Sequence, residues 1–167
     1  VTGEHTGRTD VPLTDVGRDQ ARAVAPLLPP GPYGTVLTSP LRRAADTAIL
    51  AGYSSAEREP DLMEWDYGDV EGRSTAELRR EDPTWDVWRH GVNGGETVEA
   101  IGERVDRVIA RVRAAADGDA LLIAHSHVLR ILTARWLGLP PDAGRSFVLA
   151  TTHWSVLGWE RETPVVI

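Results

Sequence analysis

The chain has 167 residues, of which 41% are hydrophobic and 26% are charged, which is typical of one soluble globular domain. A net charge of −7 argues against nucleic acid or an anionic membrane as the main partner, and no apolar run approaches the roughly 20 residues that span a bilayer. The absence of cysteine excludes disulfides and thiolate chemistry and fits a reducing cytoplasm, where we expect the protein to be located.

The first third of the chain alternates between loop, helix and strand signals. Residues 1–14 read as a loop, and apolar residues at helical spacing predict a helix over residues 15–28, which ends at a proline-rich stretch. Residues 35–38 predict a short strand. Ser39 is the expected N-cap of the following helix, which runs over residues 40–50 and has a proline at its first position.

The middle of the chain is rich in glycine, acidic residues and tryptophan. A short strand is expected around residues 59–62, followed by a carboxylate-rich loop over residues 63–72. Short helices are predicted over residues 74–81 and 82–88. The longest helix should begin at Thr97, carry one apolar stripe to about Ala116 and stop at Asp117.

The last third contains the stretch that best defines the fold. Residues 120–124 form a short apolar run, which is typical of a parallel strand buried on both faces, and residues 128–137 have helical spacing. Two final strands are predicted over residues 147–151 and 153–160. This alternation predicts one α/β domain over residues 1–167, a three-layer sandwich with a mixed, mostly parallel sheet and helices on both faces.

His125 follows the buried strand directly, where the chain turns into the next helix. That turn lies at the carboxyl edge of the sheet, where open α/β sheets bind ligands, and a helix N-terminus there favours an anion. Arg43 occupies a similar place after the strand at residues 35–38. A simpler interpretation is that His125 and His127 are two imidazoles at a solvent-exposed turn. From this placement alone, that interpretation and an anion site have about equal weight.

An arginine, a carboxylic acid and an imidazole suit phosphoryl transfer without a metal ion. Arg43, Glu64 and His125 are the candidates. Arg43 could instead be a surface arginine paired with Asp46, and Glu64 could simply belong to a solvated acidic loop. His125 and His127 could also ligate a divalent metal ion, although the strand should end before both could share a face.

Several segments together resemble the histidine phosphatase superfamily, also called phosphoglycerate mutase-like. They follow the family order over nearly the whole chain, and the pattern around Glu64 is most similar to compact actinobacterial acid phosphatases of this superfamily. The matching segments are Gly7 to Thr14 with Gly17 and Ala21, Ser39 to Ala48, Asp61 to Gly72, Gly95 to Thr97 with Arg104, and Ala124 to Ser126 with Arg130.

The resemblance implies a role for each candidate residue. Arg43 would hold the phosphate, Glu64 would be the general acid, and His125 would bind the transferring group and offset its charge. The residues expected to contact substrate are Thr6, Gly7, Arg43, Tyr67 and Ser126. The family implies no metal and no organic cofactor.

The nucleophile motif of the family is missing from the chain. In the family, a histidine within Arg-His-Gly ends the first strand, shortly before the segment that matches Gly7. Arg89 to Gly91 spells these letters, but no apolar strand precedes it. We therefore interpret the first strand as lying upstream of Val1. Glu4, where arginine is usual in the family, is a second departure.

These features predict hydrolysis of a small phosphomonoester through a phosphohistidine intermediate. Because Glu64 should be protonated to serve the leaving group, an acidic optimum is expected. The alternative is a phosphoglycerate mutase, and a second alternative is a non-catalytic phosphate-binding module. A homodimer is compatible with the sequence.

Overall fold

A parallel sheet forms the middle layer of the structure, a computed structural model that describes residues 3–115 and 118–167. Its strand order is β2 (Glu57–Arg58), β1 (Tyr33–Thr38) and β3 (Asp119–Ile123), with β1 parallel to both neighbours. β4 (Leu157–Glu160) and β5 (Thr163–Val166) pair with each other as a separate antiparallel hairpin.

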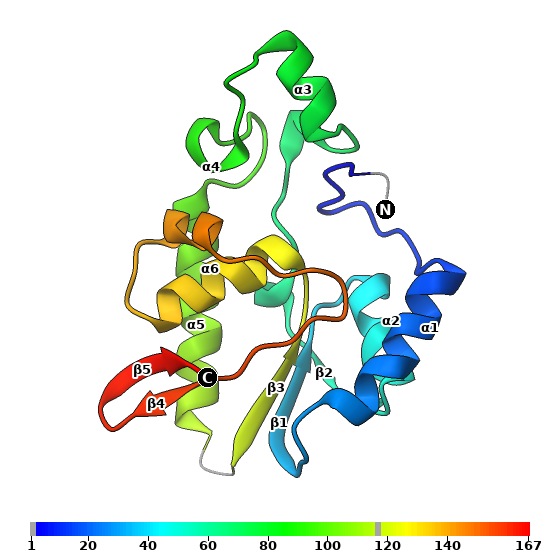
Figure 1. Ribbon diagram of the computed structural model, residues 1–167, viewed down its shortest axis with the longest axis vertical. Coiled ribbons are helices and arrows are strands. Elements are labelled where there is room, and N and C mark those ends of the chain that lie inside the picture. Colours follow the sequence, from blue (N-terminus) through cyan, green and yellow to red (C-terminus); the bar gives the residue numbers. More distant parts are fainter. Residues whose placement is uncertain (1–2, 116–117) are drawn as a thin grey trace.

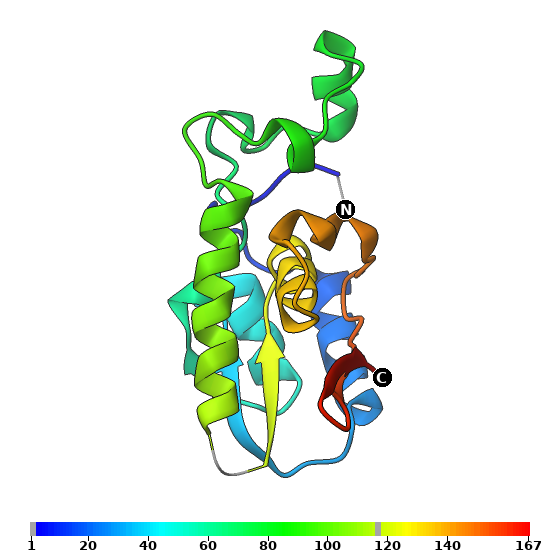
Figure 2. The same cartoon turned by 90° about the vertical axis from the view of Figure 1, so that its left-hand side faces the viewer.

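Helices cover both faces of this sheet, as predicted (Figures 1 and 2). One face carries α1 (Asp15–Val24) and α2 (Arg42–Leu50), and the other carries α5 (Val98–Ala114) and α6 (Ser126–Trp136). The main core lies between the sheet, α5 and α6. Its most deeply buried side chains are Leu37, Leu62, Trp65, Ile101, Val105, Val128 and Ile131.

Two short helices extend beyond the carboxyl edge of the sheet (Figure 1). α3 (Thr75–Glu81) begins at Ser74, whose hydroxyl and the Glu77 carboxylate form a capping box, and α4 (Val87–His90) is capped by Asp86. We call residues 72–95 the upper segment. Backbone bonds from His5 N to Arg73 O (2.9 Å) and from Gly72 N to His5 O (2.8 Å) tie it to the N-terminal loop.

Some predicted helix boundaries agree with the structure and others do not. Thr97 caps α5 as expected, by accepting a hydrogen bond from Ala100 N at 3.1 Å. The expected end at Ala116 and stop at Asp117 lie outside the described residues. The helix predicted over residues 15–28 ends as an α-helix at Val24 and continues as a 3₁₀ turn, because Pro26 cannot donate a backbone hydrogen bond.

Three other predictions about short elements and their boundaries were wrong. Ser39 does not cap α2: Leu41 is the N-cap, and the Ser39 hydroxyl instead bonds to His125. The strand expected over residues 59–62 is a 3₁₀ turn, Pro60–Leu62, preceded by the two-residue β2, since Pro60 cannot donate to a strand ladder. The helix expected from residue 82 starts only at Val87.

The C-terminal strands also differ from the prediction. Residues 147–151 form no strand, and of residues 153–160 only Leu157–Glu160 is β-structure. β4 pairs with β5, a strand that was not predicted. The two strands can pair because a tight turn at Arg161 (φ 57°) joins them. Residues 147–156 instead cross the front of the molecule as an irregular segment (Figure 1).

β3 has a free edge in the part of the chain that the structure describes. It pairs only with β1, and its side chains from Ala120 to Ile123 are partly exposed rather than buried on both faces. In Figure 2, β3 lies between β1 and the β4–β5 hairpin. An unpaired edge explains the exposure, because a parallel strand is buried only where both neighbours and both covering layers are present.

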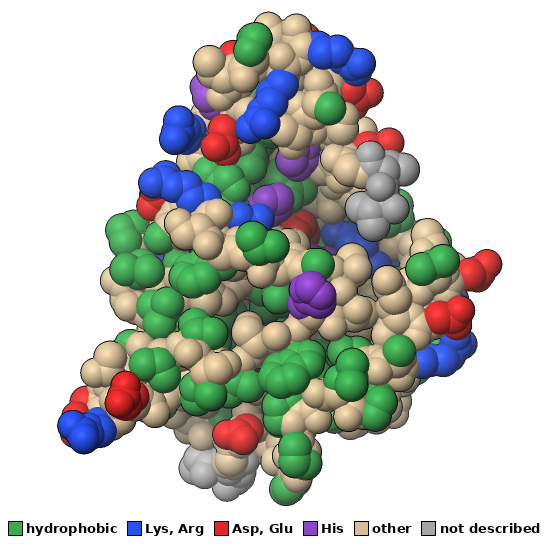
Figure 3. Space-filling view, in the orientation of Figure 1, with side chains coloured by type: hydrophobic (Ala, Val, Ile, Leu, Met, Phe, Trp, Pro, Cys, Tyr) green, Lys and Arg blue, Asp and Glu red, His purple; other side chains and the backbone are tan. Residues whose placement is uncertain are grey.

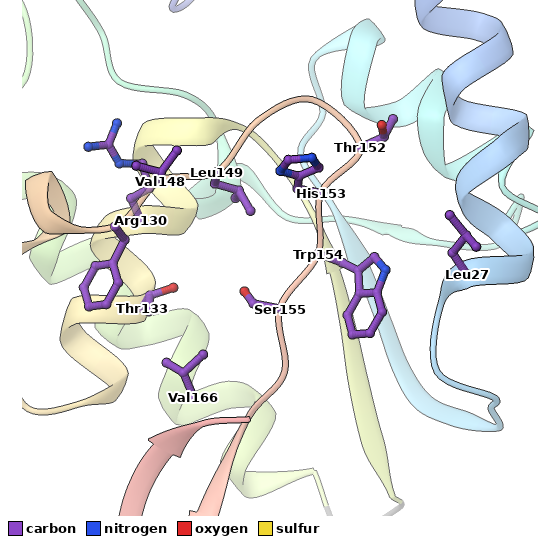
Figure 4. A pocket seen from close by; sticks show the side chains of 11 residues that line it. Leu27, Arg130, Thr133, Val148, Leu149, Thr152, His153, Trp154, Ser155 and Val166 are labelled. Atoms are coloured by element: carbon purple, nitrogen blue, oxygen red, sulfur yellow. The ribbon is translucent and has the colours of Figure 1, made fainter.

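A largely apolar groove of ≈ 370 Å³ lies in front of this edge (Figure 4). Its walls come from the 3₁₀ turn after α1, from α6, from β5 and from residues 147–155. Several of its apolar side chains are exposed to solvent, namely Leu27, Val148, Trp154 and Val166. None of the described helices is long and apolar enough to cross a membrane.

Candidate functional site

Glu64 is a buried carboxylate at the carboxyl edge of the sheet, with only 5% of its surface exposed. It accepts backbone hydrogen bonds from Trp65 N (2.9 Å), His127 N (3.2 Å) and Val128 N (3.1 Å). The last two donors belong to the first turn of α6, whose N-terminus favours negative charge. The start of α6 is therefore already engaged by the carboxylate of Glu64.

Arg104 holds the loop that carries Glu64. The guanidinium group, itself buried, donates to the carbonyl oxygens of Asp61 and Met63 (both 2.7 Å) and of Glu64 (3.3 Å). It also pairs with both carboxylate oxygens of Glu96 at 2.9 and 3.1 Å. These contacts attach the backbone of residues 61–64, at the start of the carboxylate-rich loop, to the long helix α5.

His125 lies where β3 turns into α6, and it is 91% buried, with an exposed fraction of 9%. Its Nε2 lies 2.8 Å from the Ser39 hydroxyl. Burial lowers the pKa of His125 to about 4, although the Glu64 carboxylate acts in the opposite direction. The ring is therefore neutral at pH 5 and above, and it can donate one hydrogen bond without carrying charge.

Arg43 projects from the first turn of α2 into the N-terminal loop. Its guanidinium donates to the carbonyl oxygens of Thr9 (3.0 Å), Thr6 (3.1 Å) and Gly7 (2.8 Å). Arg43 lies close to His125 and Glu64. Burial lowers the pKa of Arg43, and the negative charge of Glu64 opposes this effect. The positive charge of Arg43 in turn helps burial to lower the pKa of His125.

Glu71 shapes the same loop from the other side. Its carboxylate accepts hydrogen bonds from the backbone N of Gly7 (2.8 and 3.0 Å) and of Thr9 (3.1 Å). A side chain at residue 7 would collide with the Trp65 carbonyl, since a Cβ there would lie 2.1 Å from that oxygen. Glycine is therefore required where the loop passes over the acidic segment.

His127 forms a pair with Tyr67, the phenol oxygen lying 2.5 Å from Nδ1. Burial raises the pKa of the Tyr67 phenol far above its ordinary value and lowers that of His127, so both groups are neutral near pH 7. The phenol then donates to Nδ1, and the remaining imidazole proton is on Nε2. Tyr67 thus sets the tautomer of His127.

The pKa of Glu64 is below the ordinary value in the ligand-free protein. Burial acts to raise it, but the positive charge that His127 and His125 carry when they are protonated and the backbone donors at Trp65 and His127 outweigh this effect. Glu64 is therefore ionised near neutral pH. A group with a lowered pKa stabilises the fold above its unfolded pKa, and that contribution is lost as the pH falls through its folded pKa.

The site opens into a hollow between the upper segment and the rest of the protein, and histidine side chains line it (Figure 3). His5 is half-buried, and its Nε2 lies 3.0 Å from the Thr75 hydroxyl of α3. Burial lowers the pKa of His5. Among residues 3–115 and 118–167, no group of three or more His, Asp or Glu side chains is arranged to hold a metal ion.

The structure places the predicted site residues in two groups. Arg43, Glu64 and His125 lie close enough to influence one another's pKa, and Arg43 donates to the backbone of Thr6 and Gly7. Tyr67 is 2% exposed and bonded to His127, and the Ser126 hydroxyl donates to the Leu149 carbonyl at 2.9 Å, so both hydroxyls have protein partners. The assigned roles stay predictions.

Sequence reasoning did not identify the roles of His127, Glu71 and Ser39. His127 had been considered only as a metal ligand, and Glu71 only as part of an acidic motif. Their contacts join residues 60 or more positions apart, as in Tyr67 to His127 and Gly7 to Glu71. The available signal was the unusual density of carboxylates and histidines beside the motif residues.

Comparisons with known proteins agree on one family. The sequence model of the histidine phosphatase superfamily (branch 1) matches residues 1–167. An acid phosphatase of Mycobacterium tuberculosis is 39% identical, over 95% of this chain and 79% of that protein. The adenosylcobalamin/alpha-ribazole phosphatase of Salmonella typhimurium is 35% identical, over 94% of this chain and 83% of that protein.

A solved structure gives the same result for the fold. The solved structure is that of the product of an open reading frame of Mycobacterium tuberculosis. It superposes on this chain with a TM-score of 0.90 at 37% sequence identity. The match covers 99% of this chain and 87% of that chain. The phosphoglycerate mutase-like architecture predicted from the sequence is therefore confirmed.

We predict that Arg43→Gln weakens binding of vanadate or inorganic phosphate at least about tenfold, the contribution expected of a charge-assisted hydrogen bond. Calorimetric titration measures the affinity directly. The matched control is Arg42→Gln, because Arg42 neighbours it in α2 but has an exposed side chain. Equal affinity in the Arg43 variant and the wild type would place the anion site elsewhere.

Proposed function

This chain belongs to the histidine phosphatase superfamily, and we propose that it hydrolyses phosphomonoesters, with Arg43 and His125 binding the phosphoryl group and Glu64 beside the leaving oxygen. The observation that carries the proposal is the meeting of a buried carboxylate, a neutral buried imidazole and an arginine at one edge of the sheet. Arginine and a donated imidazole N–H stabilise charge on the equatorial phosphoryl oxygens.

The reaction would proceed in two in-line steps through a phosphohistidine. In the first, a histidine nitrogen forms a bond to phosphorus, the bond from phosphorus to the ester oxygen breaks, and the alcohol leaves with a proton delivered at Glu64. In the second, water attacks phosphorus, gives its proton to Glu64, and the P–N bond breaks to release inorganic phosphate. Dividing the transfer lowers the barrier of each step.

The nucleophile would come from a strand upstream of Val1 that lies along the free edge of β3. Three features support this placement. β3 has no second neighbour among the described residues, its side chains are partly exposed, and an apolar groove lies in front of it (Figure 4). A parallel strand seated there would end at the carboxyl edge, beside His125 and Arg43.

The proton for the alcohol would arrive with the substrate. Glu64 has a lowered pKa in the ligand-free protein and is therefore ionised before the ester binds. A phosphate monoester holds its second proton below about pH 6. Binding of the monoanion brings this proton beside Glu64, and the negative charge of the bound ester raises the pKa of the carboxylate. Glu64 can then accept the proton and pass it to the leaving oxygen.

Hydrolysis is preferred over the mutase alternative because the site is open to water. A mutase must enclose the phosphorylated enzyme while the phosphoglycerate reorients, which requires a closed lid. Here the upper segment extends away from the sheet and leaves a hollow beneath it (Figures 1 and 3). Its two helices have only seven and four residues.

The direct test compares phosphate release with mutase activity in one preparation of the chain extended by its upstream residues. We expect release of phosphate from a generic aryl phosphate at mildly acidic pH and no interconversion of 2- and 3-phosphoglycerate. Faster isomerisation than phosphate release would favour the mutase. Inactivity of the extended chain in both assays would favour a phosphate-binding module.

Glu64→Gln should lower turnover of alkyl phosphates by about 10²- to 10⁴-fold, the usual contribution of general acid catalysis, and affect aryl phosphates much less. An aryloxide can leave unprotonated, whereas an alkoxide cannot. Steady-state kinetics on one alkyl and one aryl ester measure the difference. Equal losses on both substrates would assign Glu64 a structural or electrostatic role instead.

The kcat/KM for an alkyl phosphate should fall as the pH rises through about 6, where the ester loses the proton that it delivers. His125 gives no competing change in this range, because its pKa of about 4 keeps it neutral throughout. A pH profile from 5 to 8 measures the midpoint. A rate that rises between pH 6 and 8 would contradict delivery of the proton by the substrate.

A further inference from the structure

Six rings pack into one cluster beside Glu64, which we call the aromatic cluster. Its members are His5, Trp65, Tyr67, Trp85, Trp88 and His127. Ring centroids lie 4.9 Å apart for His5 and Tyr67, 5.4 Å apart for His5 and Trp85, and 5.2 Å apart for Trp88 and His127. These separations are typical of favourable aromatic packing.

The members of the aromatic cluster divide by exposure. Trp65 and Tyr67 are 0% and 2% exposed, so they belong to the core. His5, Trp85, Trp88 and His127 are only partly buried. Trp85 and Trp88 also pack against the hydrophobic core, so these four rings are each covered in part by protein and in part open to solvent.

The position of the aromatic cluster is on the leaving-group side of the proposed reaction. The backbone N–H of His127 donates to Glu64 Oε2 at 3.2 Å, which places the cluster directly beside that carboxylate. The phosphoryl group would lie toward Arg43 and His125. An alcohol whose oxygen sits at Glu64 would then lie on the side of the aromatic cluster.

The aromatic cluster offers this alcohol no charge. Tyr67 keeps its proton, and burial keeps both His5 and His127 neutral near pH 7 by lowering their pKa values. Arg130 stacks over Trp88 at 4.8 Å, but its guanidinium donates to the carbonyl oxygens of Gly144 and Arg145. Ring faces, ring edges and an imidazole N–H remain for contact with the substrate.

Trp85 is held in place by groups that do not take part in the reaction. Its backbone carbonyl accepts a hydrogen bond from Arg79 Nε at 2.9 Å, and its backbone N–H donates to Asp82 O at 2.9 Å. His5, against which it packs, is bonded to Thr75. These bonds hold the backbone of Trp85, and its ring packs against His5 in a T-shaped arrangement.

We propose that the site selects phosphomonoesters of aromatic alcohols, with Trp85 and His5 stacking on the ring of the leaving group. This inference rests on the proposed phosphatase function and adds a substrate class to it. Trp85 is a specificity-determining residue in this view. Planar rings should be preferred over saturated rings of the same size, because stacking depends on the aromatic face rather than on apolar area alone.

The test uses benzyl phosphate and cyclohexylmethyl phosphate with the chain extended by its upstream residues. Both esters release primary alcohols of similar basicity, so intrinsic reactivity does not decide the outcome. We expect the wild type to favour benzyl phosphate in kcat/KM by roughly 2- to 10-fold, the range that an aromatic pair contributes. Trp85→Leu should bring the ratio close to one, and Trp85→Phe should retain most of it.

The matched control is Trp159→Leu, in which a half-exposed tryptophan of β4, packed against Trp136 and outside the aromatic cluster, is replaced. Its ratio should equal that of the wild type. Equal use of both esters by the wild type, or an unchanged ratio in Trp85→Leu, would overturn the substrate class and leave phosphatase activity intact. Absence of phosphate release from every ester would overturn the proposed function and this inference with it.

Discussion

The buried carboxylate of Glu64 is the constraint on which the rest of the site depends. An ionised carboxylate is stable in a protein interior only if donors replace the water that it loses. Here three backbone N–H groups do so, and two of them form the start of α6. This requirement fixes the acidic loop against the helix that follows β3, and so brings Glu64 close to His125.

A second layer of contacts makes that arrangement rigid. Arg104 binds the carbonyl oxygens of Asp61, Met63 and Glu64 and the carboxylate of Glu96. The loop that carries Glu64 is thereby attached to α5 by side-chain hydrogen bonds. On the opposite side Glu71 holds the N-terminal loop through the backbone N–H of Gly7. The reactive groups are thus positioned by buried charge pairs and backbone donors, and the loops that carry them need no regular secondary structure.

The sequence predicted the layered fold and the grouping of Arg43, Glu64 and His125, because these depend on local periodicity and on motifs that stay in chain order. It did not predict that Ser39 bonds to His125 instead of capping α2, because that contact joins residues 86 positions apart. The apolar run of β3 suggested burial on both faces, yet the strand is partly exposed. Hydrophobicity reports what a strand can tolerate, whereas exposure depends on which neighbours are present.

The most direct test is to measure the pKa of Glu64. NMR of the protein labelled with ¹³C at the glutamate carboxylates measures it, with and without bound vanadate. The account predicts an ionised Glu64 in the ligand-free protein, with a pKa below the ordinary value, and a rise in that pKa when the anion binds beside it. Glu64 that is already protonated at pH 6 without ligand, or a pKa that vanadate leaves unchanged, would contradict the account.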